Sequence, residues 1–182
     1  MNPVRNIKYA CRKKTIKKAT SVRNITYKSI SNGVKVAVRN LQKKIPVNPK
    51  RITKTVLKIL SQEGIKKSGE ITVCFVNDSK IKELNLKYLG KSNPTDVIAF
   101  DIAEPKCEDK IFADIVISTD RAIDNADAFK TSPYFELYLY VIHGVLHILG
   151  YDDRNIKDKL LMRRREESLL NILNLSPIIH NP

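Results

Sequence analysis

Alternating and β-branched apolar runs mark four strands in this chain. Val34, Val36 and Val38 alternate with more polar residues, the period of a half-buried strand, and a Ser-Asn-Gly turn signal at 31–33 precedes them. Residues 70–76 form a β-branched run. The expected strands cover residues 34–39, 70–76, 95–100 and 113–118, with a short run at 25–28 on the other side of the turn.

A period near 3.6 marks the helices. Ile52 and Val56 lie on one face of an expected helix at 49–62, and Asp78 or Ser79 is expected to cap the next helix. Further helices are expected at about 119–129, 133–149 and 155–173. The chain is therefore predicted to have an α+β fold, in which a small mixed four-stranded sheet is packed with about five helices.

Positive charge is concentrated at the start of the chain. The first 50 residues hold 14 Lys and Arg and no acidic residue, whereas residues 51–182 hold 19 of each sign, so the net charge of +14 belongs to the first 50. Such asymmetry is typical of contact with nucleic acid, and a disordered solubilising arm is the alternative. We expect residues 1–22 to form a basic, mobile extension and residues 23–182 to form one domain.

The composition argues against a membrane protein and a disulfide-rich protein. No apolar run approaches the roughly 20 residues that span a bilayer, and no signal-peptide core follows the basic N-terminus. A cytoplasmic protein is therefore expected. Cys11, Cys74 and Cys107 are odd in number and show no CxxC spacing, so they indicate neither a disulfide framework nor a zinc ribbon. Cys74 lies in an apolar run and is expected to be a buried thiol.

The stretch 143–153 carries the chemistry. His143 and His147 are four residues apart on an expected helix, so their imidazoles share one face and can converge on one ion. Gly150 is a natural helix stop, after which the chain can turn back and present Asp153 to the same point. Three such ligands leave a fourth position of Zn²⁺ open for water, whose pKa the ion lowers to about 7. The sequence therefore predicts a catalytic metal site on the histidine-bearing helix.

The same stretch also fits a pair of core histidines or a metalloprotease motif. A histidine on an apolar helix is often a core residue, but His143 and His147 are two of only three histidines in the chain. The His-Glu-x-x-His motif of metalloproteases has the same spacing, with glutamate as the general base. Here that position is Gly144, which cannot move protons. Mn²⁺, Fe²⁺ and Ni²⁺ also suit these ligands, less selectively than zinc.

Three segments resemble one known family. The stretch 143–153 is similar to the signature of the YbeY family of endoribonucleases, H-G-x-L-H-L-x-G-Y-D-H. Residues 84–100 resemble the family's L-N-x-x-Y-R-x-K-D-x-P-T-D-V-L-S-F, and residues 113–118 resemble G-D-I-V-I-S. The segments occur in family order, and the resemblance covers roughly residues 33–175.

The resemblance implies a metal-dependent, single-strand-specific endoribonuclease that acts in 16S ribosomal RNA maturation and small-subunit quality control. It implies one zinc ion per chain, held by His143, His147 and Asp153. We expect His143 and Lys91 to be the catalytic residues, and Lys91, Asn93 and Thr95 to contact RNA beside the metal. The basic N-terminal residues would add electrostatic contacts to ribosomal RNA.

Two residues depart from the family pattern. Asp153 stands where the family has a third histidine, which adds a negative charge to the site. Asp152 matches the family's own aspartate and is expected to be structural, although a shift of one residue in register would exchange the roles of the two. Leu89 stands where the family has an arginine, and leucine has no donor for a phosphate. Two rivals therefore remain: a non-catalytic RNA-binding or ribosome-assembly protein with a structural metal, and a zinc hydrolase acting on peptides or another substrate class.

Overall fold

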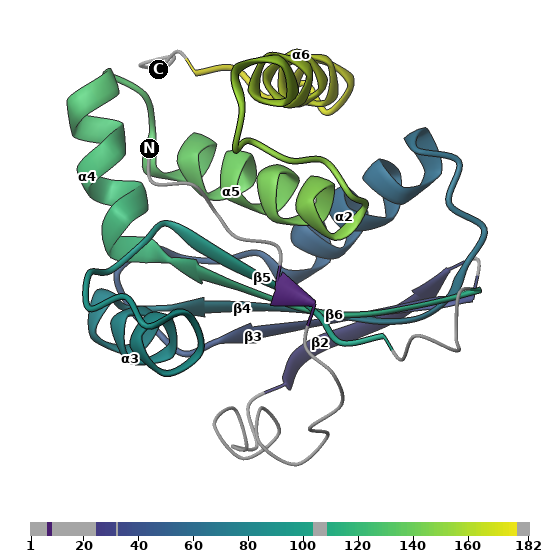
Figure 1. Ribbon diagram of the computed structural model, residues 1–182, viewed down its shortest axis with the longest axis horizontal. Coiled ribbons are helices and arrows are strands. Elements are labelled where there is room, and N and C mark those ends of the chain that lie inside the picture. The colour runs from purple at the N-terminus through teal and green to yellow at the C-terminus, as the bar shows by residue number, and fades with distance from the viewer. Residues whose placement is uncertain (1–6, 9–24, 32, 104–108, 178–182) are drawn as a thin grey trace.

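The structure is a computed structural model that describes residues 7–8, 25–31, 33–103 and 109–177 (Figure 1). Of the expected basic extension at 1–22 it describes only Ile7–Lys8, so that expectation otherwise lies outside the described residues, as do those for Cys11 and Cys107. Cys74 is buried, as expected. Within the described ranges, every helix is too short or too polar to cross a bilayer.

One mixed sheet of six strands forms the centre of the fold, in the order β1-β5-β6-β4-β3-β2. Neighbours β3, β4 and β6 are parallel, whereas β5 is antiparallel to β6 and β2 to β3. The expected four-stranded mixed sheet is the block β3, β4, β6 and β5. Strand β2, which contains the short run expected at 25–28, extends one edge, and β1 extends the other. With only two residues, β1 has no periodic pattern that the sequence could reveal. The strands are β1 Ile7–Lys8, β2 Ile25–Ser31, β3 Val34–Asn40, β4 Ser68–Val76, β5 Val97–Asp101 and β6 Lys110–Ser118.

Five helices in the described part of the chain complete the predicted α+β fold: α2 Pro49–Gln62, α3 Asp78–Leu89, α4 Thr119–Phe129, α5 Pro133–Ile148 and α6 Ile156–Ile172. Each follows an Asn or Ser whose side chain accepts a hydrogen bond from the backbone N–H three residues on. Helix α3 is capped by Asn77, not by Asp78 or Ser79 as expected. The Asn77 amide oxygen lies 3.0 Å from the N–H of Lys80, and Asp78 instead binds Ser118 and Arg121.

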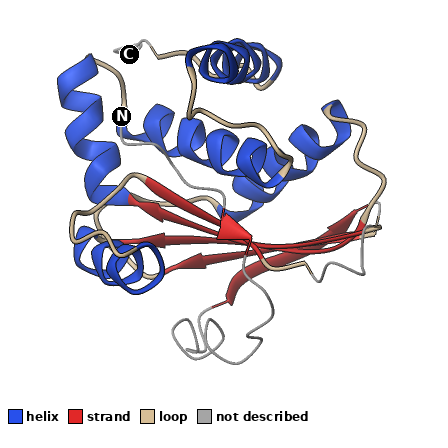
Figure 2. Cartoon of the chain, viewed as in Figure 1, coloured by secondary structure: helices blue, strands red, loops and turns tan. Residues whose placement is uncertain are grey.

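The helices cover the two faces of the sheet unequally (Figure 2). Helices α2 and α5 pack on one face and α3 on the other, and α6 lies across the outside of α5. Because side chains alternate along a strand, Val73 and Phe75 of β4 join the core under α5, whereas Cys74 and Val76 join a smaller cluster under α3. Helix α5 is therefore enclosed between the sheet and α6, which explains its apolar sequence.

Gly144 is the point at which α5 comes closest to the sheet. A Cβ atom placed on this residue would lie 2.6 Å from Cγ2 of Ile115 and 3.2 Å from Cγ2 of Val97. Side-chain atoms do not approach that closely, so a larger residue would push the helix away from β5 and β6. The absence of a side chain at this position therefore sets the height of α5 above the sheet, and with it the height of His143 and His147.

Gly144→Ala should lower the free energy of unfolding by up to about 2 kcal/mol. Alanine improves helix propensity by about 1 kcal/mol, but overpacking a core costs about 1–3 kcal/mol. Denaturant unfolding would measure the change. The cost should shrink in an Ile115→Ala background, where the contacted methyl group is absent. A Gly144→Ala variant more stable than wild type would show that helix propensity outweighs the contact.

A candidate metal centre between α5 and α6

The two histidines of α5 point their Nε2 atoms at each other. These atoms are 3.0 Å apart, and the rings are nearly perpendicular, at 85°. Each Nδ1 has its own partner: that of His143 lies 2.5 Å from Oε1 of Glu166 on α6, and that of His147 lies 3.0 Å from the carbonyl oxygen of Tyr151. With Nδ1 as the donor in both rings, both Nε2 lone pairs face one point.

The turn after α5 is fixed from two sides. Gly150 adopts a φ of +99°, which suits glycine and reverses the chain. Tyr151 accepts the His147 hydrogen bond through its carbonyl oxygen and donates its hydroxyl to Oε2 of Glu63 at 3.0 Å. Glu63, just beyond α2, also binds Nε of Arg165 on α6 at 2.5 Å. The turn, α2 and α6 are thus joined through one carboxylate.

This turn places Asp153, and not Asp152, beside the histidines. One ligand atom from each of His143, His147 and Asp153 lies within 4.8 Å of the other two. The Oδ1 atom of Asp152 instead accepts hydrogen bonds from the backbone N–H groups of Asp153 and Arg154, at 2.8 and 3.2 Å, and its carboxylate pairs with the Arg154 side chain. The Arg154 hydrogen bond lowers the pKa of Asp152 despite partial burial.

The pKa values of the two histidines are shifted in opposite directions. Burial, together with the charge of His143, lowers the pKa of His147 to about 4. Burial also opposes charge on His143, but the hydrogen bond and charge of Glu166, with Asp96 and Asp153, outweigh it and raise that pKa. Two facing nitrogens only 3.0 Å apart repel unless a proton or another cation lies between them. The pair is therefore built to take up one positive charge.

A metal ion fits these residues. The Oδ1 atom of Asp153 is buried, yet no donor among the described residues reaches it. A buried carboxylate oxygen without a partner is costly, and a cation between it and the two Nε2 atoms would remove that cost. Two imidazoles and a carboxylate are a common donor set for a catalytic divalent ion. The cluster can hold a metal ion.

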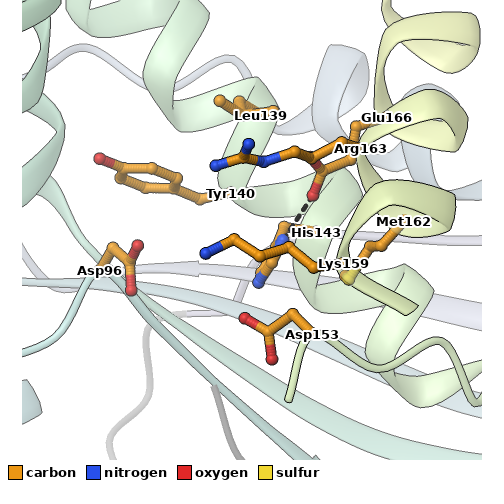
Figure 3. A pocket seen from close by; sticks show the side chains of 9 residues that line it. All are labelled: Asp96, Leu139, Tyr140, His143, Asp153, Lys159, Met162, Arg163 and Glu166. Carbon is orange, nitrogen blue, oxygen red and sulfur yellow. Dashed lines mark hydrogen bonds and ion pairs between the residues drawn. The ribbon is translucent and has the colours of Figure 1, made fainter. Parts of the chain in front are cut away.

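Two residues of the metal cluster, His143 and Asp153, line a pocket between α5 and α6, called here the metal pocket (Figure 3). Lys159, Arg163 and Glu166 were not anticipated from the sequence. They recur at i, i+4 and i+7 on α6, which places them on one helical face, but spacing alone does not say that this face meets α5. The pocket is lined by Asp96, Leu139, Tyr140, His143, Asp153, Lys159, Met162, Arg163 and Glu166.

The expected RNA-binding residues lie outside this pocket. Lys91 and Asn93 follow α3, where the Asn93 carbonyl oxygen accepts a hydrogen bond from Asn85 at 2.6 Å. Thr95 lies nearer, because its hydroxyl binds Oδ1 of the pocket residue Asp96 at 3.0 Å. None of the three lines the pocket itself. The structure thus brings the three expected metal ligands together and leaves Lys91 and Asn93 apart from them.

Leu89 also lies away from the pocket. It is half-buried at the end of α3 and packs against the cluster that includes Leu84 and Ile98, on the face of the sheet opposite α5. Leu89 therefore contributes to the packing of α3 and not to the wall of the metal pocket.

Comparisons with known proteins identify a family for this chain. The family model of endoribonuclease YbeY matches residues 37–174. A protein named endoribonuclease YbeY from Syntrophus aciditrophicus (strain SB) is 35% identical over 148 residues, which cover 79% of this chain and 92% of the relative. Another of that name, from Flavobacterium psychrophilum, is 42% identical over 117 residues, covering 64% and 80%.

A solved structure resembles the fold as well. The solution structure of a Thermotoga maritima protein has a TM-score of 0.51 and 22% identity, and the match covers 76% of this chain and 91% of that one. At this identity the likeness concerns the fold alone. The matched residues 37–174 include both histidines and Asp153, and the family match spans most of the sequence. The chain belongs to the endoribonuclease YbeY family.

Proposed function

We propose that this protein is a zinc-dependent, single-strand-specific endoribonuclease that acts in the cytoplasm on 16S ribosomal RNA, in maturation and quality control of the small ribosomal subunit. The observation that carries the proposal is the cluster of His143, His147 and Asp153, with its buried, unpartnered carboxylate oxygen, in a chain whose relatives are named endoribonucleases. The excess of 14 positive charges in the first 50 residues suits a large RNA substrate.

His143, His147 and Asp153 would hold the ion. Their two nitrogens and one oxygen favour zinc over magnesium or calcium, which prefer oxygen ligands. A zinc ion there would act as a Lewis acid towards a phosphodiester and lower the pKa of water. Asp153 in place of a third histidine reduces the net charge of the site by one. That change should raise the pKa of such a water and relax metal selectivity.

The surrounding residues orient the ligands and limit water. Glu166 fixes the ring and tautomer of His143, and the Tyr151 carbonyl does the same for His147. His147 is fully buried among the described residues, whereas His143 and Asp153 are partly exposed, so a substrate would approach from their side. RNA would therefore approach through the pocket between Asp96 and α6.

A non-catalytic RNA-binding protein is the second candidate. It is favoured by Leu89, which occupies the position of the family's arginine and packs into a hydrophobic cluster, where it offers nothing to a phosphate. Lys91, two residues further on, does not line the pocket either. In this case the metal would be structural, and the protein would bind RNA without cutting it.

Purified protein should contain about one zinc ion per chain, and His147→Ala should lose it. Removing one of three protein ligands leaves too few donors to retain the ion. Plasma emission spectroscopy of protein dialysed against metal-free buffer measures the content. His180→Ala, which removes the third histidine in the sequence, is the matched control and should keep the zinc. Wild-type protein without stoichiometric metal would contradict the proposal.

Glu166→Gln should weaken zinc binding about 10–100-fold, the usual effect of losing a carboxylate that orients a ligating histidine. The substitution keeps the size of the side chain but removes the charge beside Nδ1 of His143. Competition with a chromogenic chelator measures the affinity. Glu167→Gln makes the same change at the exposed neighbouring position and should leave the affinity unchanged. Equal affinities in both variants would mean that Glu166 does not support the metal site.

Zinc-loaded protein should cleave single-stranded RNA, and His143→Ala should lower the rate at least about 100-fold, because both the ion and its Glu166-oriented ligand are lost. Gel analysis of an end-labelled RNA, with a duplex of the same sequence alongside, measures rate and strand preference. Binding without cleavage would favour the non-catalytic alternative. Chelator-sensitive cleavage of peptides, with RNA left intact, would favour a hydrolase of another substrate class.

A further inference from the structure

Two cations of α6 stand over the metal pocket. Lys159 and Arg163 both line it, and their side chains extend from α6 above His143 towards the side of Asp96 and Tyr140 (Figure 3). They are four residues apart, so they leave the helix on the same face, one turn from each other. The pocket is therefore lined by two positive groups from one helix.

The rotation of α6 that aims these two side chains is fixed by its neighbours. Met162, between them in sequence, is buried at 1% exposure in the core with α5. Glu166 binds His143, and Arg165 binds Glu63. These contacts hold the 159–163–166 face of α6 against the pocket, so the placement of Lys159 and Arg163 does not depend on contacts of their own.

Neither cation is neutralised within the described part of the chain. No carboxylate there lies within ion-pair distance of Lys159 or Arg163, although Arg165 and Arg154 on the same segment are both paired. Lys159 is half-buried and Arg163 is exposed. Their ammonium and guanidinium groups are therefore available to a ligand at the mouth of the pocket.

The charge of the pocket shows why a phosphodiester needs these groups. Asp96, Asp153 and Glu166 bring three negative charges, and a divalent ion would offset only two. Without the α6 cations the pocket would repel RNA; with them, the formal charge becomes positive. The pocket has a volume of about 30 Å³, enough for an ion and about one or two waters, so the RNA backbone must lie across its mouth.

We propose that Lys159 and Arg163 form a phosphate clamp that binds the backbone of single-stranded RNA across the mouth of the metal pocket. This proposal rests on the proposed function and names the residues that hold its substrate. Arg163 provides a planar fork that suits two phosphate oxygens, and Lys159 provides a point charge. The clamp supplies, from α6, the cationic contact that Leu89 cannot supply from α3.

The test compares two double variants of the full-length, zinc-loaded protein. Lys159→Gln/Arg163→Gln removes the clamp; Lys157→Gln/Arg164→Gln removes the same charge from exposed positions of α6 that do not line the pocket. Binding of a fluorescently labelled single-stranded RNA is measured by anisotropy, before cleavage proceeds, from about 50 to about 200 mM salt. Zinc content and the thermal unfolding midpoint are measured for all proteins.

The clamp variant should bind RNA at least about tenfold more weakly near 0.1 M salt, with the slope of log affinity against log salt reduced by about 1.4 for two lost phosphate contacts. Its zinc content and unfolding midpoint should match wild type, and Lys159→Arg should retain binding. The control pair should lose less than about threefold, because its charges act only at long range.

Three outcomes would overturn the clamp. Equal losses in the clamp and control pairs would mean that α6 acts through its overall charge, while wild-type cleavage of RNA would leave the proposed function standing. Wild-type protein that neither binds nor cleaves single-stranded RNA would remove the proposed function and the clamp together. Loss of zinc from the clamp variant would assign Lys159 and Arg163 to support of the metal site.

Discussion

The packing of α5 against the sheet at Gly144 is the constraint on which the rest of the structure depends. No side chain heavier than hydrogen fits between this helix and the methyl groups of Ile115 and Val97. The close approach buries His147 completely and leaves His143 at the edge of the core, where a second helix can reach it. Because core packing tolerates little change in volume, this single contact fixes both histidines relative to β5 and β6.

Helix α6 and the turn before it complete a site around the two histidines of α5. The Glu63 carboxylate joins Tyr151 of the turn to Arg165 of α6, and Glu166 of α6 binds His143. These contacts bring the Asp153 carboxylate, whose Oδ1 has no partner among the described residues, close to both histidines. Two nitrogen lone pairs and a carboxylate that face one another in a buried site are unfavourable without a cation. The contacts that stabilise the fold therefore also produce a site that favours a metal ion.

Under the proposed function, the positive charges of the molecule would act on RNA at two ranges. The first 50 residues carry the whole excess positive charge and can attract RNA over a distance of about a Debye length, roughly 8–10 Å. At the metal pocket the balance is local: three carboxylates face Lys159 and Arg163. Leu89 on α3 belongs to a hydrophobic cluster under the opposite face of the sheet. Cationic groups at the pocket therefore come from α6.

Local patterns in the sequence determined the elements and the ligand set. Apolar periodicity predicted α2, α4 and the centres of β3, β4 and β6, because side chains recur regularly along strands and helices. The spacing of His143, His147 and Asp153 predicted the metal cluster, because helix geometry and a glycine turn fix such short distances. Only the tertiary structure decided that Glu166, Lys159 and Arg163 share this pocket and that Lys91 does not, since contacts between α5 and α6 depend on how distant segments bury their surfaces together. It also decided why position 144 is glycine. In the sequence, Gly144 stands where a metalloprotease has its general base. In the folded protein, its lack of a side chain lets the helix of His143 and His147 pack closely on the sheet.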